Sequence, residues 1–574
     1  SVDHAVAINP ITADRIEVLR GPSALLYGSS AIGGVVNVID SRIPTRVPEG
    51  PAAATMIGTV ASAADERAIA GGLDVPVARQ IVVHSDGSYG KTDALRPGAH
   101  IPAPPLREAP PAALADLGPT LPNSGGRTWQ VAGGAALIPD GGNLGVSATR
   151  YDSLYGVPVR YSLDPSVDAE QVRLDIRQWR EDLRGEIVAG GDLIDRIKLR
   201  AGHASYRHDE LEADGAIGTT FSSDSYEARL EAIQATHGAW KGATGAQLMV
   251  RNLDIVGDEK FLPRDETRQY GLFTLQQFDI GPARVEAGGR YEHSIVIASA
   301  DPDIGNPAIR RSFDAWSGSL GASLPLSAGW RGGLNFSRSE RAPTAEELFA
   351  NGPHAGTQAF ELGDPGFGLE RSWGIEATLH GHGAGYSLSA AAYYNRFSGY
   401  IYDTQVAQSV CEVAAPGRAV DFPCFQTMQG RARHYGFEIE GTLDLARIGD
   451  YAIVADGLAD YVRVQILDQG PAPRVPPLRL LGGIAAQSDR LDGRIEVEWS
   501  DSQTRVTGFE TPTPGYTMVN ASLAFRPFGP ERQTSITLSA NNIFDVVARR
   551  HASFLKDYAP LAGRDIRLSL RVAI

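Results

Sequence analysis

The clearest pattern along this chain is an alternation of apolar and polar residues with a period of two. From Ile566 to Ile574 every second residue is apolar, and Arg567, Ser569, Arg571 and Ala573 stand between them. Residues 172–177 and 197–200 alternate in the same way, with charged residues at the polar positions. Successive side chains of a strand point to opposite faces, so the pattern predicts strands with one apolar and one polar face.

Two kinds of protein contain such strands, a soluble β-sandwich and a membrane barrel. The chain has no run of 18 or more apolar residues, which excludes a transmembrane helix from the sequence. A membrane protein that crosses without helices must be a closed β-barrel, because lipid cannot satisfy open backbone groups. Arginine is costly on a lipid-facing strand but acceptable in a wet lumen. We therefore expect Val172, Leu174 and Ile176 to face lipid and Arg173 and Arg177 to face the lumen.

Strand-like segments and turns repeat from residue 52 to the C-terminus. A sandwich seldom extends over so long a stretch, which favours the barrel. We predict an all-β fold, a 22-stranded antiparallel transmembrane β-barrel of the plugged transporter size. The proline-rich residues 96–123 and residues 301–306 and 406–429 are predicted loops.

The N-terminal region has a different pattern. Residues 16–19 and 35–39 read as two strands, separated by a turn at Gly21-Pro22 and a short helix. Prolines between residues 44 and 51 predict an extended linker, because proline cannot donate to a sheet ladder. The expected organisation is residues 1–44 as one unit, 45–51 as a linker and 52–574 as the barrel.

The net charge, the motifs and the two cysteines bear on which partners, activities and cross-links the chain can have. The net charge of -15 argues against a nucleic-acid partner, which requires a basic face. The sequence shows no glycine-rich phosphate loop, nucleophile elbow or Ser/His/Asp set, so we predict no enzyme. Cys411 and Cys424 lie in one predicted loop. A barrel that folds through an oxidising compartment favours a disulfide between them, although a soft metal site or two reduced thiols remain alternatives.

Residues 16–39, with the segment Arg-Gly-Pro-Ser-Ala-Leu-Leu-Tyr-Gly at their centre, closely resemble the end of the plug domain of TonB-dependent outer-membrane receptors. The resemblance implies a plugged barrel in the outer membrane of a Gram-negative cell, surrounded by lipid and acting as a monomer. It implies active uptake of a scarce ligand, energised by TonB with ExbB and ExbD through a segment N-terminal to the plug. Because Ser1 follows no signal peptide and the plug-like region is short, we expect a fragment that lacks most of the plug.

Other segments resemble the ZnuD-like zinc-uptake branch of that family. They are Tyr155–Pro158, Arg341–His354, Thr357–Asp364, Tyr435–Glu440, Tyr516–Asn520 and His551–Arg564. The resemblance implies a metal site where plug and barrel meet, with ligands that map onto Asp3, Glu210 and His354. A further plug histidine would lie upstream of Ser1. His4 and His208 are possible substitutes, and imidazole with carboxylate suits Zn²⁺, which would be a transported ligand and not a resident cofactor.

The chain departs from the resemblance at two places, and the first of them keeps other ligands open. The predicted external loop at residues 159–170 has no histidine, although the zinc branch carries a histidine-rich loop there. The whole chain has only 12 histidines. Ile574 stands where most outer-membrane barrels end in an aromatic residue. The alternatives are a receptor for an iron chelate such as a siderophore or haem, a passive porin-like channel, and a surface adhesion barrel. On the plainest interpretation Asp3, His4 and Glu210 are solvated surface residues. Glu17, Arg20, Arg338 and Arg341 resemble charges that pin a plug in a barrel.

Overall fold

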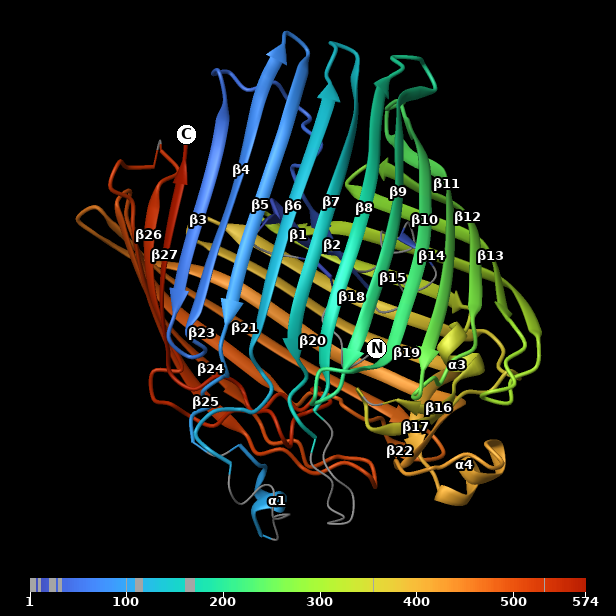
Figure 1. Cartoon of the computed structure of the whole chain (residues 1–574). Coiled ribbons are helices and arrows are strands. Elements are labelled where there is room, and N and C mark those ends of the chain that lie inside the picture. Colours follow the sequence, from blue (N-terminus) through green and yellow to red (C-terminus); the bar gives the residue numbers. More distant parts are fainter. Residues whose placement is uncertain are drawn as a thin grey trace.

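The computed structural model describes residues 7–8, 12–19, 27–28, 34–99, 101–108, 117–160, 171–354, 356–530 and 532–574. Within these ranges 22 long strands form one closed antiparallel barrel, which confirms the predicted fold class (Figure 1). Closure is made by β27 against β3, with Arg567 opposite Ala61 and Ala573 opposite Thr55. A closed barrel has no free strand edge, so every strand satisfies its backbone groups against its two neighbours.

The strands of the first half of the barrel are β3 (Ala53–Ala61), β4 (Glu66–Ala78), β5 (Ile81–Thr92), β6 (Gly126–Leu137), β7 (Gly142–Gly156), β8 (Arg173–Val188), β9 (Ile194–Leu211), β10 (Ile217–Gln234), β11 (Trp240–Gly257), β12 (Asp265–Ile280) and β13 (Ala283–Ala298). The second half contains β14 (Ile309–Ser327), β15 (Trp330–Arg341), β18 (Glu370–Gly383), β19 (Tyr386–Gln405), β20 (Cys424–Ile448), β21 (Tyr451–Ile466), β23 (Arg479–Gln487), β24 (Leu491–Ser500), β25 (Tyr516–Phe525), β26 (Ser535–Asn541) and β27 (Asp565–Ala573).

The two ends of the barrel differ in their connections. One end, here called the turn end, has short links such as residues 79–80, 384–385 and 449–450. The opposite end, the loop end, has long connections whose described residues form three helices, α1 (Pro104–Glu108), α3 (Ala345–Phe349) and α4 (Gln408–Ala414). The short strands β16 (Asn351–His354), β17 (Ala359–Leu362) and β22 (Gly470–Pro471) also lie there. In Figure 1 the turn end is at the top and the loop end at the bottom.

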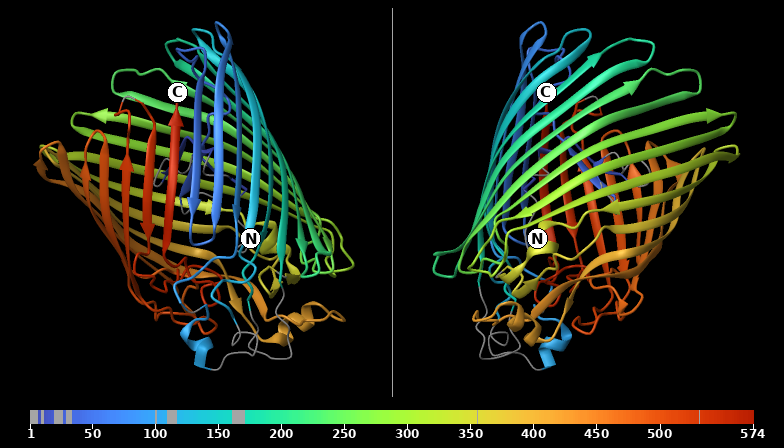
Figure 2. Two further views of the ribbon diagram at one scale, coloured as in Figure 1. Left: turned by 60° about the vertical axis from the view of Figure 1, so that its left-hand side comes forward. Right: turned by 90° about the vertical axis from the view of Figure 1, so that its right-hand side faces the viewer.

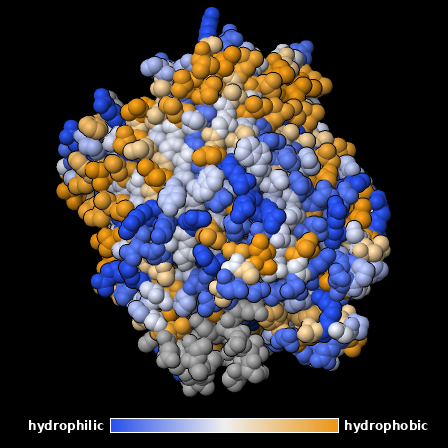
Figure 3. Space-filling view, in the orientation of Figure 1, coloured by the Kyte–Doolittle hydropathy of each residue, from blue (hydrophilic) through white to orange (hydrophobic). Residues whose placement is uncertain are grey.

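The outer wall carries the apolar face of the strands. Leu568, Leu570 and Leu199 are exposed on it, whereas Arg567 of β27 pairs with Glu66 of β4 at 2.6 Å, across the intervening strand β3. Hydrophobic side chains gather toward the turn end of the visible face, and hydrophilic ones become common toward the loop end (Figure 3). No helix among the described residues is long and apolar enough to cross a membrane.

The loop-end part of β8 departs from the expected orientation. Leu174 and Ile176 are almost completely buried, in a cluster with Val172, Tyr151 and Val157. The alternating arginines face outward instead, and the Arg177 side chain is half exposed beside Asp175. The prediction that these apolar residues face lipid is wrong. At the loop end the outside of the barrel meets water and the inside packs on loops, so the apolar face turns inward.

The N-terminal region forms a separate two-stranded sheet, β1 (Arg15–Leu19) and β2 (Val35–Ile39), paired antiparallel with Leu19 opposite Val35. This sheet lies inside the barrel in Figures 1 and 2. Val18 of β1 helps to line a cavity of about 840 Å³ whose other walls come from the barrel strands β13 to β23. The turn and short helix predicted between the two strands lie outside the described residues, apart from residues 27–28.

One loop-end connection is covalently closed. Cys411 of α4 and Cys424, the first residue of β20, form a disulfide with a Cα–Cα distance of 5.9 Å. Both cysteines are completely buried against Phe360 and Ala415. The predicted loop 406–429 is thus shorter than expected, because it contains α4 and gives way to β20 at Cys424.

Candidate functional site

The segment from Arg341 to His354 places a histidine inside the loop end of the barrel. Thr344 caps α3 through a reciprocal capping box with Glu347, which satisfies backbone donors at the start of the helix. Arg341 anchors the same turn to Glu347 and Glu370. Leu348 and Phe349 then bury themselves in the largest apolar cluster of the loop end. The chain is thereby fixed before it enters β16, whose last residue is His354.

Glu346 of α3 makes a charged contact with Arg251 on the barrel wall. Burial by itself would raise the pKa of the Glu346 carboxyl, but attraction to Arg251 and its hydrogen bond outweigh burial and lower the pKa. The distance from the Arg251 Nη2 to the Glu346 Oε1 is 3.0 Å. The helix is therefore tied to the barrel wall by a charged contact as well as by apolar packing.

β16 and β17 form a small hairpin that holds His354. The register places His354 opposite Ala359 and Gly352 opposite Glu361, so all four residues share one face. A Cβ on Gly352 would come within 2.7 Å of the Phe261 Cα, so only glycine permits this close approach. Phe261 in turn stacks on the imidazole of His354, with ring centroids 4.4 Å apart.

β9 delivers the other predicted ligands. Glu210 and His208 are both almost completely buried at the end of this strand, so neither is a solvated loop residue. The His208 ring stacks on Phe221 of β10 at 4.3 Å, and Phe221 lies 6.2 Å from Phe261. Two histidines and two phenylalanines thus form one cluster of rings, here called the ring cluster.

The structure brings together part of the predicted metal site. The Nε2 of His354 lies 4.0 Å from the Oε1 of Glu210, and His208 joins them through the ring cluster. Asp3 and His4 lie outside the described residues. Within the described ranges no group of three or more His, Cys, Asp or Glu residues is arranged to hold a metal ion. Imidazole nitrogen and carboxylate oxygen are nevertheless suitable zinc donors, so the pair fits two ligands of such a site.

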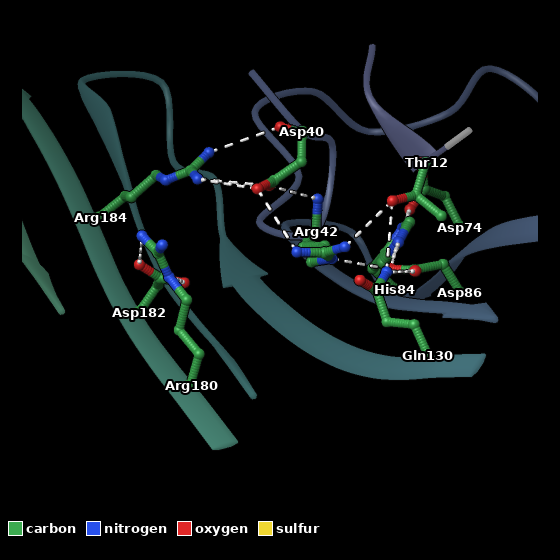
Figure 4. Close-up of polar contacts among 10 residues, drawn as sticks. All are labelled: Thr12, Asp40, Arg42, Asp74, His84, Asp86, Gln130, Arg180, Asp182 and Arg184. Carbon is green, nitrogen blue, oxygen red and sulfur yellow. Dashed lines mark hydrogen bonds and ion pairs between the residues drawn. The ribbon is translucent and has the colours of Figure 1, made fainter. Parts of the chain in front are cut away.

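A second polar cluster joins the N-terminal region to the barrel near the turn end (Figure 4). Arg42 donates from Nε to the Oδ2 of Asp86 on β5 at 3.2 Å, and its Nη2 lies 3.2 Å from the Oγ1 of Thr12. His84 lies between two carboxylates, with Nδ1 2.6 Å from Asp74 and Nε2 3.1 Å from Asp86. The Arg42 side chain is only 12% exposed, so these contacts are shielded from water.

Asp40 makes a second contact between the N-terminal region and the barrel wall. It accepts from the Nη2 of Arg184 on β8 at 3.2 Å, while Arg180 on the same strand pairs with Asp182. Asp40 and Arg42 thus bind two different parts of the barrel wall (Figure 4). We call the contacts of Asp40, Arg42, Asp86 and Arg184 the latch.

The charged residues expected to hold the N-terminal region in the barrel make other contacts. Arg338 pairs with Glu340, and Arg341 with Glu347 and Glu370, so both join parts of the barrel itself. Glu17 pairs with Arg15 within β1. Arg20 lies outside the described residues. The described polar contacts between the two parts come instead from Asp40 and Arg42, which follow β2, and from Thr12, whose Oγ1 accepts from the Nε2 of Gln130 on β6 at 3.2 Å.

Comparison with protein families decides the identity of this architecture. Residues 117–543 match the family model of the TonB dependent receptor-like β-barrel, and residues 2–35 match that of the TonB-dependent receptor plug domain. The chain belongs to the TonB-dependent receptor family. Among curated proteins, the ferric enterobactin receptor PirA of Pseudomonas aeruginosa is 37% identical over 87 residues. That match spans 15% of this chain and 12% of the length of that receptor.

Solved structures of this receptor fold superpose on nearly the whole chain. The copper transporter OprC has a TM-score of 0.80 and 15% identity, and the match covers 99% of this chain and 89% of that protein. The FrpB iron transporter from Neisseria meningitidis, F3-3 variant, has a TM-score of 0.74 and 12% identity, with coverage of 99% and 88%. At these identities the likeness concerns the fold alone.

Several residues of both clusters were not predicted from the sequence. Glu361 and Thr357 lie in a segment that carries the family resemblance, but their contact with His354 depends on the β16–β17 register. Asp86 and His84 lie 44 and 42 positions from Arg42 along the chain, and nothing in the local pattern pairs them. The only signal was the charged pair Asp40 and Arg42 directly after a predicted strand.

Proposed function

We propose that this receptor takes up a scarce metal across the outer membrane of a Gram-negative cell, with Zn²⁺ as the first candidate. The observation that carries the proposal is the buried His354–Glu210 pair at the loop end, where an incoming ligand would meet the barrel interior. The pair offers one imidazole nitrogen and one carboxylate oxygen, the donors that zinc prefers besides thiolate. Asp3, with His4 and His208 as substitutes, completes the proposed set.

The proposed mechanism is coupled transport. Zn²⁺ would first bind at the ring cluster, where phenylalanine stacking keeps the imidazoles in place before the metal arrives. A barrel filled by a plug offers no open path, so work must be done on the plug to release the ion. TonB, with ExbB and ExbD, would supply that work by pulling on a segment N-terminal to the plug. The receptor would act as a monomer in lipid.

The second candidate is a receptor for another metal complex. The local match to a protein named as a ferric enterobactin receptor favours an iron chelate. Copper also binds imidazole readily. A passive channel is disfavoured by the latch, which ties the N-terminal region to two barrel strands.

Isothermal titration of the full-length receptor tests this proposal. Zn²⁺, Cu²⁺ and ferric enterobactin are titrated separately into wild type, His354→Ala and Glu210→Ala. Loss of one ligand should weaken Zn²⁺ binding by at least about 10–100-fold, the usual loss for a mere outer-sphere partner. His237→Ala is the matched control, because this histidine is exposed in a connection at the turn end. Wild type that binds ferric enterobactin or Cu²⁺ and no Zn²⁺ would contradict the zinc assignment.

A further inference from the structure

Beside the proposed ligand pair, a second carboxylate contacts the other nitrogen of His354. The Oε1 of Glu361 lies 3.0 Å from His354 Nδ1, on the side opposite the Nε2 that faces Glu210. Thr357 donates its hydroxyl hydrogen to the same Oε1 at 2.8 Å. An oxygen that receives a hydroxyl donor is acting as an acceptor, so the hydrogen of the His354 contact belongs to Nδ1.

This arrangement decides which tautomer the imidazole adopts. When Nδ1 carries the hydrogen, the lone pair of a neutral histidine lies on Nε2. The Nε2 atom is the one directed toward Glu210, at 4.0 Å. Histidines that bind metals almost always donate their second N–H to a carboxylate, carbonyl or water, which orients the ring and raises its basicity.

The surroundings restrict the ring further. Phe261 covers one face of the imidazole at a centroid distance of 4.4 Å and an angle of 14°. The Thr357 hydroxyl oxygen also lies 3.2 Å from the His354 carbonyl oxygen, so its single hydrogen has two acceptors within reach, this carbonyl and the Glu361 carboxylate. His354 is 2% exposed. Its position and its tautomer are thus set by different partners.

The hairpin is also connected to two outer loops. The Nη1 of Arg160 donates to the carbonyl oxygen of Thr357 at 2.7 Å. The same guanidinium lies 5.1 Å from the centre of the Phe554 ring, in the connection between β26 and β27. Glu361 therefore connects His354, the proposed metal ligand, to Thr357, which Arg160 in turn contacts from an outer loop.

We propose that Glu361 is a positioning residue that holds His354 in the Nδ1–H tautomer and so presents Nε2 to the transported metal. The inference rests on the proposed function and adds a residue that the family resemblance does not assign. A rival explanation is a purely structural ion pair, in which His354 is doubly protonated and Glu361 only fastens the hairpin. The two explanations differ in the tautomer and in the effect on metal affinity.

The first measurement uses the metal-free, full-length receptor. Nitrogen-15 NMR of selectively labelled histidine reports whether Nδ1, Nε2 or both carry hydrogen on His354, assigned through His354→Ala. Wild type is expected to show the Nδ1–H form, and Glu361→Met to lose this preference because no acceptor remains. Glu361→Gln is expected to keep it, because its carbonyl oxygen still accepts. A doubly protonated wild type, or an unchanged tautomer in Glu361→Met, overturns the inference.

The second measurement is Zn²⁺ titration of the same variants. We expect Glu361→Met to bind about 10–100-fold more weakly than wild type, with partial recovery in Glu361→Gln. Glu498→Gln is the matched control, since this buried carboxylate of β24 pairs with Arg550 of the β26–β27 connection and accepts from Tyr516 of β25. Heat-modifiable gel migration verifies that each barrel is folded. If wild type binds Zn²⁺ and Glu361→Met binds it equally, the inference fails, whereas a wild type that binds no Zn²⁺ overturns the proposed function.

Discussion

At the scale of single residues, burial at the loop end decides which side chains matter. Leu174 and His551 are both almost completely buried, although neither lies in a compact soluble core. Each is enclosed where loops pack on the barrel interior, and each has a clear physical consequence. The Leu174 side chain fills part of a buried apolar cluster. The His551 imidazole is a titratable group shielded from water.

Leu174→Ala is expected to destabilise the barrel by about 2–5 kcal/mol, because the lost side chain leaves a cavity that the strand cannot collapse. Leu568→Ala is the matched control, since Leu568 is 46% exposed on the outer wall and its removal leaves no cavity. Urea unfolding of both variants in lipid vesicles measures the difference. Equal midpoints for the two variants would contradict the inward orientation of β8.

We expect the contact of His551 with Thr513, which joins the β26–β27 and β24–β25 connections, to depend on pH. Its Nδ1 lies 2.8 Å from the Thr513 hydroxyl oxygen. Burial lowers the pKa of the His551 imidazole, against the attraction of Glu510 and together with the repulsion of Lys556. The folded form therefore disfavours the proton that an unfolded histidine takes up near pH 6.5. The stabilisation is full above that pH and is lost as the pH falls further toward the lowered pKa.

Hydrogen exchange at pH 7.5 and pH 5.5, corrected for the intrinsic rates, checks this expectation. Residues 501–515 should lose protection at the lower pH in wild type. In His551→Asn the side chain still offers a hydrogen bond to Thr513 but cannot titrate, so protection should change less between the two pH values. The same loss of protection in both proteins would assign the pH effect to another group.

At the scale of the elements, the alternating pattern correctly predicted strands but not always their faces. A period of two identifies two faces and leaves open which one meets lipid. In β27 the apolar face is outward, and in the loop-end part of β8 it is inward. The difference is the depth of each segment, because the solvent outside the wall changes from lipid to water along one strand.

The disulfide stabilises the connection between β19 and β20. Closing a loop of this length should contribute about 3 kcal/mol by restricting the unfolded chain. The double variant Cys411→Ser and Cys424→Ser should therefore be cut more rapidly within residues 406–423 by a protease that leaves the barrel intact. Wild type unfolded without reductant should not react with a thiol reagent. Modification of both cysteines in that protein would show that the bond does not form.

At the scale of the whole molecule, the latch determines how the N-terminal region is held inside the barrel. Arg42 and Asp86 are 12% and 8% exposed, and removing one partner of a buried ion pair typically costs about 3–5 kcal/mol. Arg42→Ala in the full-length receptor should therefore open conducting paths more often in a planar lipid bilayer. Arg46→Ala, an exposed arginine of the linker that follows, is the control. Equal conductance in both variants would contradict a holding role for the latch.

The candidate site was predictable only in part. His354 and Glu210 were predicted through short segments that resemble the zinc branch, and the structure places them 4.0 Å apart. Glu361 was not predicted, because it meets His354 only through the register of a hairpin of four-residue strands. Asp86 and Arg42 meet only because the segment after β2 passes β5 inside the closed barrel. Contacts between distant segments leave no mark in a local pattern.

The amino-acid sequence by itself determined that this chain forms a barrel. The period of two, the absence of a long apolar run and the need to satisfy every backbone group in lipid together allow few other folds. Only the tertiary structure decided which face of β8 points inward, which carboxylate holds His354 and where the N-terminal region is attached. These features depend on depth in the membrane, strand register and barrel closure, and such long-range geometry cannot be derived from neighbouring residues.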